Sequence, residues 1–140
     1  MNNSEIFFDR VIEYGSIHYD HFTRFKKYPD NDKLEYRNLV RGVCCVLLLE
    51  KEGVSLNLEA RMPKKVSTKT LQKLFKKHSQ IISENVGSEM IWTESNSNSE
   101  PSKVTIFHEF PEKRTDLTFI NYVKLLTSSM NEMILAVISV

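Results

Sequence analysis

Lysine and arginine side chains gather in one stretch of this 140-residue chain from which acidic residues are absent. No Asp or Glu lies between Glu59 and Glu84, yet this stretch holds 7 of the chain's 19 basic residues. They are Arg61, Lys64, Lys65, Lys69, Lys73, Lys76 and Lys77. Clustered ammonium groups can contact phosphate backbones or other anionic surfaces without reading base edges. We therefore predict an anion-binding face that docks nucleic acid or an acidic protein surface, and the alternative is a solvated face that only keeps the protein soluble.

A small metal-dependent nuclease is the enzymatic alternative. Pro29-Asp30 precedes a strand with Glu59-Ala60-Arg61, and nucleases use two carboxylates and a nearby cation to hold Mg²⁺ and stabilise phosphoryl charge. Arg stands here where that arrangement has Lys. No glycine-rich phosphate loop and no Ser-His-Asp grouping stands out. We expect a binding module rather than an enzyme, with no catalytic residue, no metal and no cofactor.

Two adjacent cysteines, Cys44 and Cys45, lie in a run of apolar residues. Neighbouring residues of a strand point to opposite faces, so a disulfide between the two would be strained. Free, inert thiols are typical of a reducing cytoplasm. We also see no secretory signal and no apolar span of about 20 residues, so we expect a cytoplasmic protein with no membrane partner.

Hydrophobic periodicity divides the chain into helices and strands. Apolar residues recur every three or four positions in the first part, and they alternate on both sides of a turn at Gly53. Ser67 is a typical helix N-cap and Gly87 a typical helix stop. The expected elements, in chain order, are a helix over 4–28, strands over 39–50 and 54–60, a helix over 68–86, strands over 90–93 and 104–110, and a helix from 115 or 116 to the end. Gly15 weakens the middle of the first helix, so a kink or two shorter helices is the alternative there.

The order α-β-β-α-β-β-α predicts one α+β domain over residues 1–140. Four strands from two hairpins would form an antiparallel sheet, with three helices packed on it. The first strand is apolar on both faces, so it should lie centrally in the sheet. Residues 94–102 are rich in Ser and Asn, which predicts a mobile polar loop between the last two strands.

The last helix is apolar on nearly every side, because Asp116, Lys124 and Glu132 are the only charged residues of 116–140. Such a helix is buried on more than one side, either inside the domain or against a second copy. A two-fold homodimer is the commonest self-association, and we expect one here. The residues expected at its interface are Phe119, Tyr122, Val123, Leu126, Met130, Met133, Ile134 and Val137.

Acidic residues predominate in a different segment, from Glu84 to Glu112. A third interpretation is therefore an inhibitor or regulator, of phage or host, that binds a single protein through this acidic surface. It differs from the first interpretation in the sign of the charge that makes contact.

A strand over 53–59 is followed by the segment Leu71-Gln72-Lys73-Leu74-Phe75-Lys76-Lys77, by Gly87, by a strand with Ile91-Trp92 and by a strand over 103–106. Over residues 53–110 this pattern resembles an uncharacterised bacterial domain of unknown function that is found beside restriction-type nuclease domains. The chain has Ile82-Ser83-Glu84 where that family has adjacent Ile-Glu. The resemblance implies a phage or bacterial defence setting, or a DNA transaction, and it brings no catalytic residues.

Overall fold

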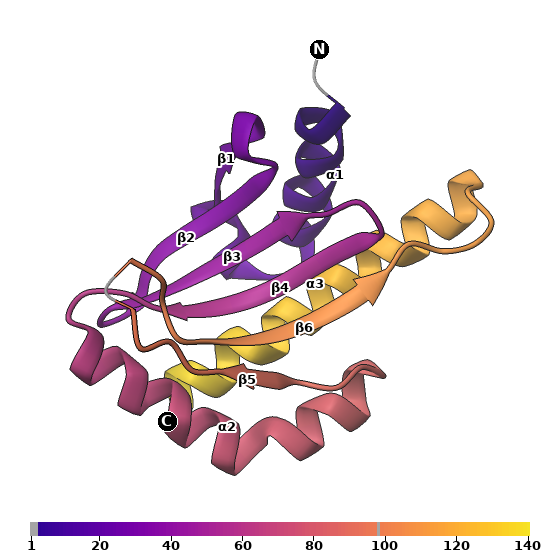
Figure 1. Cartoon of the computed structure of the whole chain (residues 1–140). Helices are drawn as coiled ribbons and strands as arrows, with labels where there is room; N and C mark the ends of the chain where they lie inside the picture. The colour runs from indigo at the N-terminus through magenta and orange to yellow at the C-terminus, as the bar shows by residue number, and fades with distance from the viewer. Residues whose placement is uncertain (1–2, 98) are drawn as a thin grey trace.

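The computed structural model describes residues 3–97 and 99–140 as two layers, with a sheet on one side and three helices on the other (Figure 1). The prediction of an α+β fold with three helices and an antiparallel sheet is confirmed. The helices are α1 (Asn3–His18), α2 (Lys64–Val86) and α3 (Asp116–Ser139). The strands are β1 (Lys26–Tyr28), β2 (Lys33–Val40), β3 (Val43–Leu49), β4 (Gly53–Ala60), β5 (Ile91–Thr93) and β6 (Lys103–Glu109).

The predicted number of four strands is wrong, because the described sheet has six, in the spatial order β1-β2-β3-β4-β6-β5. Strand β1 lies in residues that we assigned to a helix over 4–28, and most of β2 lies in residues 33–38, to which we assigned no helix or strand. The helix ends at His18 and is followed by a short 3-10 helix, Asp20–Arg24. A side chain at Gly15 would overlap Phe22, since its Cβ would lie 2.4 Å from the Phe22 ring, so Gly15 allows the chain to fold back here.

Strand β2 was missed because charged residues occupy alternate positions in its first half. Leu34 faces the core and is buried, whereas Lys33, Glu35 and Arg37 point to the opposite face. Only pairing with residues distant in the sequence makes such a strand stable. Asn38 has φ 53° and lies where the pairing with β3 changes register.

The predicted hairpin is confirmed as β3 and β4, which pair from Val43 with Ala60 to Leu49 with Val54. Both strands are central in the sheet, as the apolar run of β3 predicted. Alternate residues of each strand, such as Leu47, Leu56 and Leu58, enter one core with the helices. The described helices contribute no cover to the opposite sheet face (Figure 1).

Helix α2 begins at Lys64, four residues before the predicted start at 68. Ser67 does not cap it; this side chain is buried and its Oγ donates a hydrogen bond to the carbonyl of Arg61, at 2.7 Å. Gly87 does end the helix, in the left-handed conformation with φ 74°. Of the two residues at which the last helix was predicted to begin, Thr115 is its N-cap and forms a capping box with Thr118.

Helix α3 packs on the sheet and contacts both α1 and α2, so it is covered from several sides. This arrangement explains why nearly all its faces are apolar. Its buried side chains include Leu126, Met130 and Met133, each fully shielded from solvent. In the part of the chain that the structure describes, no helix is long and apolar enough to cross a membrane.

Candidate functional site

Five lysines form a stripe on the outer face of α2, and we call them the lysine ridge. They are Lys65, Lys69, Lys73, Lys76 and Lys77, and all five are exposed. Steps of three and four residues keep them on one side of the helix, over a length of about 18 Å at 1.5 Å per residue.

The core determines which way the lysine ridge points. Leu71, Leu74 and Ile82 are buried against the sheet and α3, and Phe75 lies 6.4 Å from Trp92 of β5, measured between ring centroids. The lysines occupy the remaining face of α2, which therefore turns outward along the edge of the molecule (Figure 1).

The charges of the ridge have no local counterions among residues 3–97 and 99–140. Among the described residues, no carboxylate oxygen lies within ion-pairing distance of a ridge lysine. The first turn of α2 has no acidic residue either. Three like-charge pairs at i and i+4, for example Lys69 with Lys73, repel one another and reduce the stability of the helix slightly. The ridge thus projects positive potential into solvent.

Two residues that we predicted to belong to this face have other partners. The Nζ of Lys64 reaches two backbone carbonyls of the β5–β6 connection, at 3.4 Å from Ser97 and 3.3 Å from Glu100. The guanidinium of Arg61 lies on the uncovered face of the sheet, where it contacts Glu35 and Glu59. The structure brings the five ridge lysines together and places Arg61 in a separate cluster.

That cluster is an ion network around a buried carboxylate, and we call it the Glu35 network. The side chain of Glu35 is 1% exposed, yet it accepts from Lys33 Nζ at 2.6 Å, from Arg37 Nε at 3.1 Å and from Arg61 Nη1 at 3.0 Å. Arg61 also holds Glu59, at 3.0 Å, so the network contains three cations and two carboxylates.

The network controls the protonation of its central carboxylate. Burial alone would raise the pKa of Glu35, but the hydrogen bonds from Arg61, Lys33 and Arg37 outweigh burial and lower the pKa to about 2. Glu35 is therefore ionised at neutral pH. A buried charge that is paired in this way stabilises a fold only while every partner is present.

The cysteines are buried free thiols, as the sequence predicted. Burial raises the pKa of the Cys44 thiol to about 12, with Arg61 nearby opposing that shift. Burial also raises the pKa of Cys45, whose Sγ lies 3.7 Å from Met130 Sδ. Neither thiol forms the nucleophilic thiolate near neutral pH.

His108 lies between two serines that are distant from it in the sequence, a grouping that the sequence analysis missed. His108 of β6 is 3.0 Å from Ser129 Oγ through Nε2 and 3.2 Å from Ser88 Oγ through Nδ1. Burial lowers the pKa of His108, which favours the neutral ring. Because Ser129 is completely buried, no substrate reaches the pair. Its role is to connect β6 with α3 and with the end of α2.

The carboxylates proposed for a nuclease do not converge. Asp30 lies in the turn before β2, beyond the end where Lys33 pairs with Leu48. Glu59 pairs with Cys44, which lies near the other end of β3 from Leu48. The length of strand between these two positions of β3 therefore separates Asp30 from Glu59 by roughly 13 Å. Within the described residues, no group of three or more His, Cys, Asp or Glu side chains is placed to hold a metal ion.

The acidic segment over 84–112 runs from the end of α2 through β5 and β6. Its carboxylates are exposed, at Glu84, Glu89, Glu94, Glu100, Glu109 and Glu112. This surface is open to a basic protein partner, and that interpretation stays a prediction.

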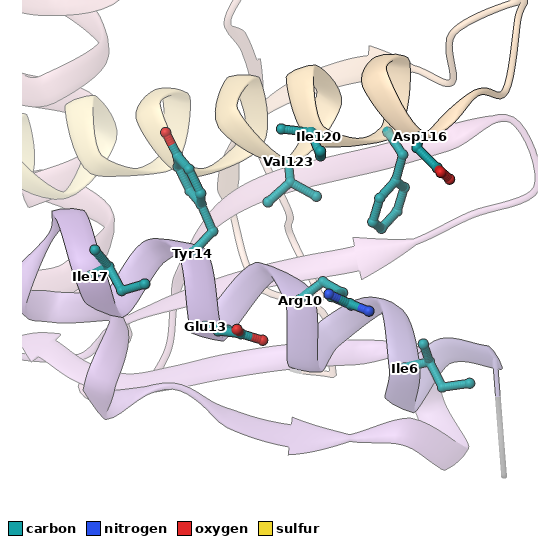
Figure 2. Close-up of a pocket in the computed structure, with 9 residues that line it drawn as sticks. Ile6, Arg10, Glu13, Tyr14, Ile17, Asp116, Ile120 and Val123 are labelled. Atoms are coloured by element: carbon teal, nitrogen blue, oxygen red, sulfur yellow. The ribbon is translucent and has the colours of Figure 1, made fainter.

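A groove of about 620 Å³ lies between α1 and α3 on the helical side of the molecule (Figure 2). Phe119 and Val123 of the predicted dimer interface line it, together with the exposed Ile120. The other predicted interface residues are buried inside the chain itself, so an interface on α3 has to use different side chains. Those buried residues are Tyr122, Leu126, Met130, Met133, Ile134 and Val137.

No protein-family model matches the chain, and no curated protein matches its sequence. Among solved structures, it is similar to the crystal structure of YbjN from E. coli, a proposed transcription regulator. The TM-score is 0.49 at 9% sequence identity, over 91% of this chain and 89% of that one. Similarity at this level carries no functional argument, and the resemblance of residues 53–110 to a bacterial domain stays a prediction.

Proposed function

We propose that this protein is a non-enzymatic binding module that docks the phosphate backbone of a nucleic acid on the lysine ridge of α2. The proposal is supported by one observation above all: the ridge lysines are aligned on one helical face and no described carboxylate neutralises them. Lysine ammonium groups bind phosphates as flexible point charges.

The charges of the ridge reduce the stability of the folded chain, and a surface that served only solubility would not need such an arrangement. The ridge therefore favours a binding role. Lys64 and Lys65 lie in the first turn of a helix, where the macrodipole disfavours cations. Neighbouring ridge lysines repel one another along the following turns. A solvated face needs neither feature, since mixed charges serve solubility equally well. An anionic partner relieves both effects at once.

The chemistry of the ridge also sets the expected specificity. It offers no arginine fork for guanine and no exposed aromatic ring among its lysines, so base edges are not read. We expect affinity that is independent of sequence and steeply dependent on salt. Each phosphate contact contributes about −0.9 to the slope of log K against log salt on duplex DNA.

The test is fluorescence anisotropy with a labelled DNA duplex and a labelled single strand, over a salt series. The variant Lys69→Glu/Lys73→Glu/Lys76→Glu should lose affinity by about two orders of magnitude or more, and the salt slope should decrease by about 3. The matched control is Arg24→Glu/Lys51→Glu/Lys113→Glu, which makes the same change in charge at exposed sites outside α2.

Retained binding in the control and lost binding in the ridge variant would support the proposal. Equal losses in both variants would show that total charge, rather than the ridge, attracts the nucleic acid. Wild-type protein that binds neither DNA nor RNA at low salt, but binds polyglutamate through the ridge, would assign the surface to an acidic protein partner and reject the nucleic-acid proposal.

A further inference from the structure

The outer face of α1 carries four exposed residues in a symmetric order. They are Ile6, Arg10, Glu13 and Ile17, separated by four, three and four positions, so one helical stripe contains them all. Ile6 is 44% exposed and Ile17 is 74% exposed. Figure 2 shows the four side chains following one another along α1 beside the groove.

The order of these residues is self-complementary. Reversing the helix direction exchanges Ile6 with Ile17, and it exchanges the cation of Arg10 with the carboxylate of Glu13. Two antiparallel copies of α1 would therefore place isoleucine against isoleucine and opposite charge against opposite charge at every level. Only a two-fold axis that crosses α1 between Arg10 and Glu13 produces this match.

We propose that a second copy of this chain occupies this face, forming a two-fold homodimer with antiparallel α1 helices at its centre. Arg10 and Glu13 are available for the contact, because no ion pair within the described residues engages either of them. In the dimer each Arg10 pairs with the Glu13 of the other copy, which gives two equivalent ion pairs across the axis.

Helix α3 extends the apolar part of the interface. Ile120 is 48% exposed and borders the groove, while Phe119 and Val123 lie deeper in it. These side chains and the two isoleucines of α1 provide the apolar contacts, and the charged pairs fix the register. The interface is thus centred on α1 and includes only the outer edge of α3. It does not depend on the lysine ridge or on any bound anion.

Sedimentation velocity and light scattering over a concentration series test the proposal. We expect a concentration-dependent dimer, and we expect Arg10→Glu and Glu13→Arg each to raise its dissociation constant about tenfold or more. Each variant replaces two attractive contacts by two repulsive ones. All four stripe positions are on the surface or its border, so circular dichroism should show an unchanged fold.

Charge exchange gives the decisive readout. The double variant Arg10→Glu/Glu13→Arg should dimerise like the wild type, because the opposite charges still face each other. A mixture of the two single variants should form a heterodimer, although each alone is impaired. General destabilisation cannot produce either rescue.

An apolar comparison completes the test. Ile17→Asp should weaken the dimer, whereas Leu135→Asp, which changes an equally apolar and 53% exposed residue near the other end of α3, should not. The proposal is overturned if the wild type stays monomeric up to about 1 mM. A dimer that ignores the Arg10 and Glu13 variants, or that the double exchange fails to restore, overturns it equally; a monomer that instead binds a helix of another protein in the groove assigns the face to that partner.

Discussion

The lysine ridge and the Glu35 network are both rich in cations, but they differ in what surrounds those cations. The ridge has five lysines and no described carboxylate within reach. The network has three cations that converge on Glu35, with Glu59 beside Arg61. The lysines of the ridge are directed toward solvent, whereas the cations of the Glu35 network form ion pairs within the chain.

The secondary structure produces this difference. On a helix the neighbours of a side chain lie three and four residues away, and α2 places lysines at those positions. On a sheet the neighbours lie on other strands, so Glu35 reaches Arg61, which is 26 residues further along the chain. One run of basic residues in the sequence can therefore contain side chains with different roles. Arg61 and Lys65 are only four positions apart, yet Arg61 is paired within the chain and Lys65 is directed toward solvent.

The comparison predicts its largest effect at Glu35. Replacing it by glutamine (Glu35→Gln) leaves three cations around a buried neutral group, and breaking a buried ion pair from one side typically costs 3–5 kcal/mol of unfolding free energy, so we expect about 3 kcal/mol or more. Urea denaturation followed by circular dichroism measures this loss.

Glu59→Gln is the matched control, because the side chain of Glu59 is 17% exposed and Arg61 keeps its contact with Glu35. We expect a loss of about 1 kcal/mol or less from this variant. Equal losses at the two positions would show that the network has no central residue, and the contrast with the ridge would then be one of degree.

An effect of similar size, spread over a range of pH, is expected when acid titrates the network. Glu35 has its pKa lowered from 4.5 to about 2 in the folded protein, so the unfolded chain takes up the proton first as the pH falls. The contribution of Glu35 is complete above pH 4.5 and is lost progressively as the pH falls toward 2. It is on the order of 3 kcal/mol, because each unit of pKa difference corresponds to about 1.4 kcal/mol.

The measurement is the unfolding free energy as a function of pH for the wild type and for Glu35→Gln. Subtracting the two curves removes the titration of the other carboxylates. The difference should be constant above pH 4.5 and should shrink below it. A difference that instead grows as the pH falls would mean that the folded-state pKa of Glu35 lies above 4.5, and it would contradict the description of the network.

The elements with one strong period were predictable from the sequence. Strand β4 and helix α2 have a periodic apolar pattern, β3 and α3 are long apolar runs, and glycine or capping residues bound these elements, so their positions were right to within a few residues. The exposed ridge also followed from helical spacing alone, since it needs no contact with a distant residue.

The remaining features depend on contacts between distant residues. Strand β2 carries the buried carboxylate of Glu35, and one of the cations that stabilise it, Arg61, comes from a distant part of the sequence. The chain reverses direction after α1 because Phe22 packs on Gly15. The aromatic residues of this segment are spaced as in a helix, so the sequence predicted a longer helix instead. The groove between α1 and α3 requires both helices to be in place.

The smallest effect on stability is expected at the ridge itself. Lys69→Ala/Lys73→Ala/Lys76→Ala removes exposed, unpaired charges and leaves the core untouched, so each change should fall within about 0.5 kcal/mol. The sign should be stabilising, because alanine favours the helix and the i and i+4 repulsion disappears. Urea denaturation at two salt concentrations measures it, and the electrostatic part of the gain should fade in high salt.

The same variant should bind anions more weakly although its stability does not fall. This combination distinguishes the ridge from the Glu35 network. At Glu35 a lost charge lowers stability, whereas on the ridge a lost charge lowers binding while stability holds or rises. If alanine on the ridge instead destabilised the protein by more than about 1 kcal/mol, the lysines would have structural partners, and the ridge would be a second network rather than a docking surface. A gain in stability with a loss of binding is what a surface retained for a partner should show.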